Sequence, residues 1–142
     1  MNTLKAGDSV PSFIVNDHLG NQQSIAQYKG FKIIIFFYPK ANTPGCTAEA
    51  CDLRDHFKEL KDAGYVLLGV SADSEKKQKS FADKFEFPFP LLADTEKVVI
   101  DAFGVWGPKK FMGNEYDGIH RKTFIIDENG KVDRVIDKVN TK

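Results

Sequence analysis

The chain has 142 residues, 42% of them apolar and 28% charged, and its formal net charge at pH 7 is zero. This length can bury the core of one domain, which we expect to span residues 1–142. A neutral chain offers no electrostatic basis for binding nucleic acid or an anionic membrane. Its longest apolar run, residues 33–38, is far shorter than the ~20 residues of a transmembrane helix, and MNTLKAGDSV lacks the apolar core of a secretory signal. We therefore expect a cytoplasmic protein.

The first elements along the chain read as β structure. Residues 12–25 (SFIVNDHLGNQQSI) place alternating apolar residues on both sides of a turn signal at 18–21, which predicts an N-terminal β-hairpin. Residues 32–38 (KIIIFFY) form a continuous run of β-branched and aromatic side chains. Such a run is typical of a strand that is buried on both faces, and Pro39 ends it.

A helix should follow this strand. Thr43 has a side chain suited to an N-cap, Pro44 suits the first helical position, and Cys46 completes the first turn. The helical period then continues through apolar residues at positions 50, 53, 57, 60 and 63, and Gly64 can end the helix. The pattern predicts one helix over residues 44–63.

The second half of the chain alternates strands with helices and closes with a hairpin. In chain order, the patterns predict a strand over 65–73, a helix over 74–85 capped by Asp73 or Ser74, a strand over 89–94, and a helix over 95–103 that ends at Gly104. Residues 104–118 are polar and glycine-rich, without a clear period, and read as irregular. Residues 122–137 predict a hairpin around the turn Glu128-Asn129-Gly130.

This order of elements predicts an α/β fold with a mixed β-sheet flanked by helices. The two long apolar strands should be adjacent and parallel, joined by a right-handed crossover through the first helix. That connection places the loop 40–46 at the carboxyl end of the sheet, where open α/β folds keep their functional sites.

Cys46 and Cys51 are the only cysteines of the chain. In the first turn of a helix, Cys46 would face unpaired backbone N–H groups and the positive end of the helix dipole. Both favour the thiolate, which is the nucleophilic form, although a buried and inert thiol is the alternative interpretation. On an intact helix the Cα atoms of the two cysteines would lie roughly 8 to 9 Å apart. A disulfide needs less than about 7 Å, so a bond between them would require local unwinding.

Two longer motifs carry a family resemblance. Residues 39–46 match the pattern P-x-x-x-T-x-x-C, and the segment TPGCTAEACDLRD extends it. The segment GVWGPKKFMGNEYDGIHRKTFIIDENG contains Arg121 within R-x-T-F. Both motifs resemble those of peroxiredoxins, in particular the PrxQ branch, also called bacterioferritin comigratory proteins, and the match runs from about residue 5 to the end. The resemblance implies a thioredoxin-like fold.

The resemblance also implies residue roles. Cys46 corresponds to the peroxidatic cysteine, which attacks a hydroperoxide and becomes a sulfenic acid. Cys51 corresponds to the resolving cysteine of those relatives that carry one five residues downstream, which would give an intramolecular Cys46–Cys51 disulfide. Thr43 corresponds to a threonine that contacts the thiolate and the peroxide, and Pro39 to a proline that shields the site from water.

Two charged residues complete the implied site. Arg121 corresponds to the arginine that activates the thiolate and polarises the substrate, and Glu49 to a glutamate that orients this arginine. The implied enzyme is a monomeric thiol-dependent peroxidase for hydrogen peroxide and organic hydroperoxides, recycled by thioredoxin or glutaredoxin. It would need no metal or other cofactor, and the three histidines fit no zinc template.

Two other functions stay open at this point. A thiol-disulfide oxidoreductase would exchange disulfides without fast peroxide chemistry, and a non-enzymatic redox sensor would bind a partner when oxidised. Relatives of the implied kind usually continue into a closing helix where this sequence stops at DKVNTK. We therefore expect a domain without that helix.

Overall fold

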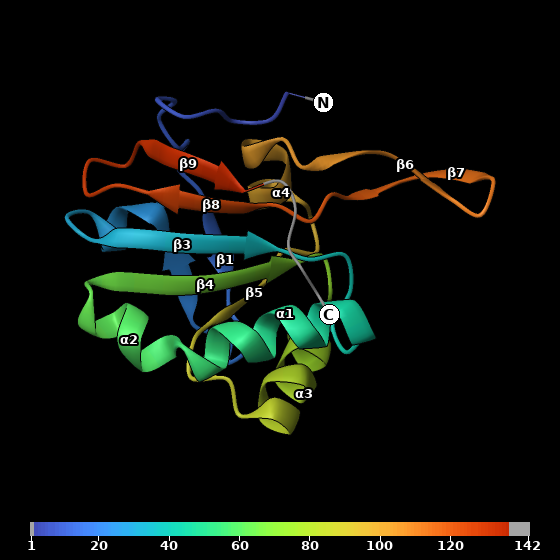
Figure 1. Cartoon of the computed structure of the whole chain (residues 1–142), viewed down its shortest axis with the longest axis horizontal. Helices are drawn as coiled ribbons and strands as arrows, with labels where there is room; N and C mark the ends of the chain where they lie inside the picture. The colour runs from blue at the N-terminus through green and yellow to red at the C-terminus, as the bar shows by residue number, and fades with distance from the viewer. Residues whose placement is uncertain (1, 137–142) are drawn as a thin grey trace.

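A five-stranded mixed sheet forms the centre of the computed structural model, which describes residues 2–136. The strand order is β5–β4–β3–β8–β9 (Figure 1). These strands are β3 (Lys32–Phe37), β4 (Tyr65–Ser71), β5 (Leu91–Ala93), β8 (Thr123–Ile126) and β9 (Val132–Ile136). Strands β3, β4 and β5 are parallel, whereas β8 and β9 are antiparallel to their neighbours. The predicted mixed sheet, with the strand after residue 31 at its centre, is confirmed.

The sheet has an apolar core on each face because side chains alternate along β3. Ile33, Ile35 and Phe37 face one core together with α4 (Val98–Phe103). The other core contains Ile34 and Phe36 of β3, and Tyr38, which comes directly after this strand. It also contains Phe81 of α3 (Glu75–Phe85). This second core contains Cys46, so the candidate site is built on the face that α1 (Pro44–Asp55) and α3 cover.

The predicted N-terminal hairpin is confirmed as β1 (Ile14–Asn16) and β2 (Gln22–Ser24), followed by the 3-10 helix η1 (Ile25–Tyr28). It is attached to the edge of the sheet through β5. The Leu91 N–H donates to His18 Nδ1 at 3.2 Å, and Asp17 forms a bridge with Leu92. The hairpin therefore covers part of the edge strand.

The single helix predicted over 44–63 is wrong, because α1 ends at Asp55 and α2 (Phe57–Asp62) begins after His56. His56 has φ −101° and ψ 5°, and its Nδ1 lies 2.8 Å from the Asp52 carbonyl oxygen. A side chain that competes for a helical carbonyl in this way weakens the helix locally. The apolar period continues across the break because Leu53 and Phe57 both pack against the same core.

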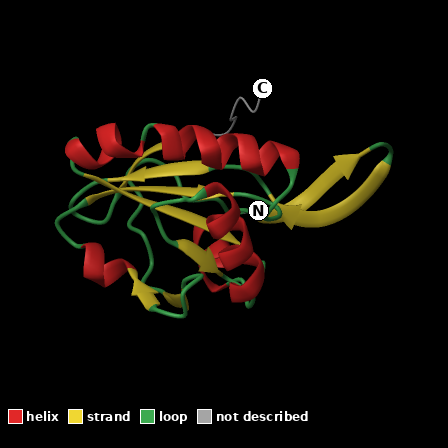
Figure 2. Ribbon diagram, turned by 90° about the horizontal axis from the view of Figure 1, so that it is seen from below, coloured by secondary structure: helices red, strands yellow, loops and turns green. Residues whose placement is uncertain are grey.

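Residues 104–118, predicted to be irregular, instead form a two-stranded ribbon of β6 (Trp106–Phe111) and β7 (Asn114–Ile119). Met112 and Gly113 both have positive φ, 51° and 81°, as expected of a type I′ hairpin turn. The sequence obscures this ribbon because methionine rarely occupies such a turn and β6 contains Pro108. Figure 2 shows the ribbon projecting beyond the end of the sheet.

The remaining helices start at recognisable caps. Ser74 caps α3 by accepting a hydrogen bond from the Lys77 N–H, as one of the two predicted caps. Helix α4 begins at Val98, later than predicted, because Lys97 has φ 59° and the Asp94 carboxylate accepts from the Val98 N–H at 2.8 Å. No helix in residues 2–136 is long and apolar enough to cross a membrane. The expected lack of a closing helix concerns residues 137–142, which lie outside the described residues.

The contact of Gly69 with its neighbours gives a test of the core. A methyl group at Gly69 would lie 2.7 Å from Leu91 Cδ2 and 2.8 Å from Phe36 Cζ, and both neighbours are fully buried. We expect Gly69→Ala to lower the free energy of unfolding by about 2 kcal/mol, as overpacked cores do, and chemical denaturation measures this loss. Gly113→Ala is the control, because open space surrounds that position and its positive φ costs roughly 1 kcal/mol. Equal losses in the two variants would refute the steric cause.

Candidate active site

The site lies where the chain leaves β3 at the carboxyl edge of the sheet and turns into α1 (Figure 1). Pro44 occupies the first helical position, so Cys46 falls in the first turn, as predicted. The Cys46 side chain is 1% exposed and belongs to the core cluster that includes Tyr38, Ala41 and Ala50. An almost buried thiol next to free helical N–H groups is held in one orientation and shielded from water.

Arg121 reaches Cys46 from the other end of the chain. Its Nη2 donates a hydrogen bond to Cys46 Sγ at 3.2 Å, across 75 positions of sequence. A guanidinium keeps its charge at any working pH, so this contact places a permanent positive charge and an N–H donor at the sulfur. The structure thus brings together two predicted site residues that lie far apart in the sequence.

Glu49 lies beside Arg121 and forms a long ion pair with it, without a hydrogen bond. Its Oε2 is 3.9 Å from Arg121 Nη1, the side chain is 3% exposed, and neither carboxylate oxygen has a hydrogen-bond partner. Burial raises the pKa of Glu49 to about 7, although Arg121 acts in the opposite direction. Glu49 is therefore close enough to influence the position of the guanidinium, and its charge changes near neutral pH.

Thr43 occupies the N-cap position, but its side chain does not cap the helix, which corrects the sequence-based expectation. The hydroxyl instead donates to the Lys40 carbonyl oxygen at 2.8 Å, which closes the loop on itself. The early N–H groups of α1, those of Gly45 and Cys46, have no intrahelical partner because of their place in the helix. They stay free of the Thr43 side chain and next to the sulfur.

Cys51 lies on the same helix as Cys46. It is half-buried, packs against the core on that face of the sheet, and both thiols are free. Helix α1 is continuous through both positions, which is the condition under which we predicted that the two thiols lie too far apart for a disulfide. Pro39 is half-buried and begins the loop that leads to Thr43.

Lys109 is a neighbour of the site that the sequence did not indicate. It projects from the β6–β7 ribbon, and its Nζ donates to the Ile119 carbonyl oxygen at 2.8 Å. Burial and the nearby Arg121 lower the pKa of Lys109, while Cys46 opposes this effect. A second cation therefore lies near enough to Cys46 to interact with it electrostatically, and only the unexpected ribbon explains how it arrives there.

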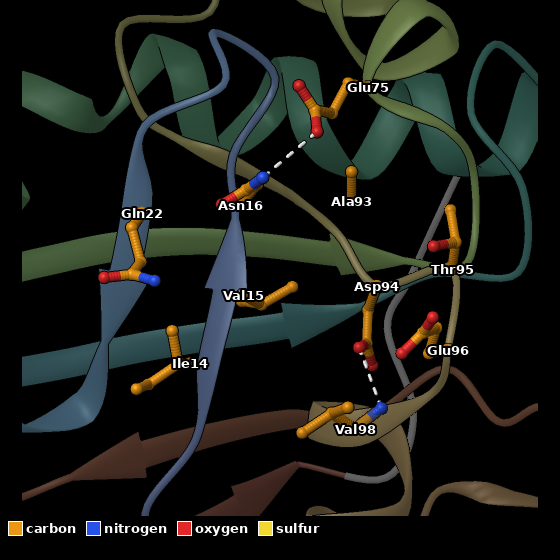
Figure 3. Close-up of a pocket in the computed structure, with 10 residues that line it drawn as sticks. All are labelled: Ile14, Val15, Asn16, Gln22, Glu75, Ala93, Asp94, Thr95, Glu96 and Val98. Atoms are coloured by element: carbon orange, nitrogen blue, oxygen red, sulfur yellow. Dashed lines mark hydrogen bonds between the residues drawn. The ribbon is translucent and has the colours of Figure 1, made fainter.

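A separate polar cavity of about 280 Å³ lies between the N-terminal hairpin and the start of α4 (Figure 3). Two of its three carboxylates are already used, since Glu75 accepts from Asn16 Nδ2 and Asp94 accepts from the Val98 N–H. None of the six predicted site residues lines this cavity. The chemistry of the cysteines is therefore separate from it.

Comparison with known sequences gives a consistent assignment. Residues 6–135 match the model of the AhpC/TSA family. The chain is 49% identical to peroxiredoxin Bcp of Escherichia coli (strain K12), over 99% of this chain and 90% of that protein. It is 47% identical to a putative peroxiredoxin bcp of Haemophilus influenzae, over 100% of this chain and 92% of that protein.

Comparison with solved structures agrees. A cysteine-to-serine mutant of Xanthomonas campestris peroxiredoxin Q is 34% identical and superposes with a TM-score of 0.88, over 97% of this chain and 88% of that chain. A cysteine-to-serine mutant of Xylella fastidiosa PrxQ is 26% identical with a TM-score of 0.93, over 100% of this chain and 91% of that chain. The chain belongs to the AhpC/TSA family and, within it, to the peroxiredoxins of the Bcp/PrxQ branch, which makes it a thiol-dependent peroxidase with a thioredoxin-like fold.

Proposed function

We propose that six residues carry out the peroxidase reaction in this chain: Cys46, Cys51, Thr43, Arg121, Pro39 and Glu49. The contact between Arg121 Nη2 and Cys46 Sγ is the observation that carries the proposal. The Cys46 thiolate attacks the terminal oxygen of a hydroperoxide, so that an S–O bond forms while the O–O bond breaks. Cys46 becomes a sulfenic acid, and the departing oxygen takes a proton to give an alcohol, or water from hydrogen peroxide.

The rate of this step must come from positioning and charge stabilisation, because a peroxide is too small to offer much binding energy. Negative charge moves from the sulfur to the leaving oxygen during the attack. Arg121 and the free N–H groups at the start of α1 are placed to follow that charge. Lys109 adds a second positive charge near Cys46 and Arg121.

Thr43 and Pro39 complete the environment of the peroxide. Because the Thr43 hydroxyl donates its hydrogen to Lys40, its oxygen lone pairs are left to accept a hydrogen bond from a peroxide O–H. Pro39 has no N–H and presents an apolar ring at the loop, which suits a role in excluding water. Alkyl peroxides are a candidate substrate class. Xanthomonas campestris bacterioferritin comigratory protein, which is 33% identical and has a solved structure, has alkyl peroxide reduction activity.

Resolution requires a change of shape. Cys51 attacks the Cys46 sulfenic acid, which forms the disulfide and releases water, but an intact α1 keeps the two sulfurs apart. The first turns of α1 must therefore unwind. Pro44 and Gly45 occupy this turn, and a helical glycine costs about 1 kcal/mol relative to alanine, which favours opening. Fast opening limits the time in which a second peroxide can over-oxidise the sulfenic acid.

A dithiol donor must then reduce the disulfide, and we infer thioredoxin, or alternatively glutaredoxin. Such a cycle suits the reducing cytosol. One chain supplies Cys46, Arg121 and Glu49 together, which supports a monomer as the working unit.

Intact mass after mixing the reduced protein with one equivalent of hydrogen peroxide tests the cycle. We expect a rapid loss of two hydrogens that Cys46→Ser abolishes. Cys51→Ser should instead gain oxygen or form an intermolecular dimer, and should over-oxidise faster than the wild type. Unchanged over-oxidation in Cys51→Ser would show that Cys51 does not resolve the sulfenic acid. Wild-type oxidation no faster than that of an ordinary exposed thiol would refute the peroxidatic role of Cys46.

Gly45 offers a test of the arginine contact. A methyl group at this position would lie 3.3 Å from Arg121 Nη2, closer than most side chains tolerate. We expect Gly45→Ala to displace the guanidinium from the sulfur and to slow Cys46 oxidation about tenfold or more, as the loss of a charge-stabilising donor does. Rapid-quench mass spectrometry measures the rate, and Gly113→Ala on the distant hairpin turn is the control. A rate equal to that of the wild type would show that the contact is not needed.

The buried carboxylate of Glu49 gives a pH test. Its pKa is about 7 when folded and 4.5 as the reference value, so folding takes up a proton between these pH values. The stability that this proton provides is complete below pH 4.5 and is lost as the pH rises through 7. Glu49→Gln stays neutral at every pH. We therefore expect its free energy of unfolding to rise relative to that of the wild type as the pH increases from 5 to 8, by on the order of 3 kcal/mol. Denaturation curves of both proteins check this, and a constant difference across the range would contradict it.

A further inference from the structure

We propose that Asp73 is a positioning residue of the peroxidase reaction, which it serves by holding the loop between β3 and α1 in place. The Ala41 N–H in this loop donates to Asp73 Oδ2 at 2.7 Å. Asp73 follows the end of β4, so the bond ties the loop of the reactive cysteine to the neighbouring parallel strand. This inference rests on the proposed function.

Asp73 is itself fixed by a hydrogen-bonded network in the core. Ser71 Oγ donates to the same Asp73 Oδ2 at 2.7 Å, and Gln78 Nε2 donates to Ser71 Oγ at 2.9 Å. Gln78 Nε2 also donates to the Leu92 carbonyl oxygen at 2.9 Å. Ser71 and Gln78 are fully buried, so their geometry is rigid, and the acceptor offered to Ala41 has a defined place.

The network returns to the site through a second route. The hydroxyl of Tyr38 donates to Gln78 Oε1, and Tyr38 is the residue directly before Pro39. Tyr38 is fully buried in the same core cluster as Cys46. Both the entry of the loop at Tyr38 and its middle at Ala41 are therefore bound to one connected set of side chains, which come from the end of β4, from Asp73 just after it, and from α3.

The loop needs such support because its backbone is strained. Asn42 has φ 67°, an uncommon value for a residue with a side chain, and lies between Ala41 and Thr43. A strained conformation persists only where the surroundings determine it fully. Without the bond to Asp73, Asn42 would be free to relax and would carry Thr43 and the first turn of α1 with it.

The chemistry makes this displacement costly for the rate. Attack on a peroxide depends on the alignment of the sulfur, the Thr43 oxygen and the helical N–H groups. A shift of about 1 Å in such an arrangement can cost on the order of a hundredfold in rate. Asp73 acts through Ala41 and does not itself touch the peroxide.

The test compares two substitutions of Asp73, of which one keeps an acceptor oxygen and the other removes it. Asp73→Asn keeps an oxygen that can accept from both Ala41 and Ser71, whereas Asp73→Ala removes it. We expect the second-order rate of Cys46 oxidation by hydrogen peroxide, measured by rapid-quench mass spectrometry, to fall at least tenfold in Asp73→Ala. It should stay within about threefold of the wild type in Asp73→Asn. Asp83→Ala on the exposed side of α3, where Asp83 pairs with Lys79, is the matched control and should have no effect.

A loss below tenfold in Asp73→Ala, or an equal loss in the alanine and asparagine variants, would overturn the inference. Wild-type oxidation as slow as that of an ordinary thiol would instead remove the proposed function on which it rests, so the two failures are distinguishable. If Asp73→Ala does not fold, amide hydrogen exchange of Ala41 in the reduced wild type decides. Protection of at least a hundredfold over an unstructured peptide supports the bond, and unprotected exchange overturns it.

Discussion

The contact between Arg121 and the Cys46 sulfur depends on the register of two antiparallel strands. Phe36 of β3 lies opposite Thr123 of β8, so Arg121 falls beside the point where β3 ends and the reactive loop begins. Side chains alternate along β8, and Ile125, which has the same parity as Arg121, packs against the core that contains Cys46. A slip of one residue would turn the arginine to the opposite face of the sheet. The sheet must also be mixed, because the parallel β3–β4 pair needs α1 as its crossover, whereas β8 runs in the opposite direction and starts where β3 ends.

Most of this architecture could be predicted from the sequence because it depends on local patterns. The run KIIIFFY, the Thr43-Pro44 helix start and the turn at Glu128-Asn129-Gly130 each indicate their element directly, and the structure confirms each. The meeting of Cys46 and Arg121 could not be derived from spacing, because it depends on pairing across 75 positions, and only the family motif indicated it.

The differences from prediction share a physical origin in single side chains. The break at His56 coincides with an imidazole that shares the Asp52 carbonyl with the backbone, and the missing cap at Thr43 arises from one hydroxyl that turns to Lys40. The spacing of apolar residues in the sequence does not reveal either of these side-chain contacts. The β6–β7 ribbon was missed because a Met-Gly turn and Pro108 hide its alternation, and the position of Lys109 near the site was missed with it.

The site concentrates several features that are unfavourable to folding. Asn42 has a strained backbone, the Thr43 side chain does not cap α1, and both Glu49 oxygens are buried without a hydrogen-bond partner. Each feature raises the free energy of the folded site relative to its opened form. The proposed resolution by Cys51 requires that same opening of the first turns of α1. In the proposed cycle, the strain that aligns Cys46 for attack on the peroxide therefore also reduces the energy needed to release Cys46 afterwards, so that one set of side chains serves both steps.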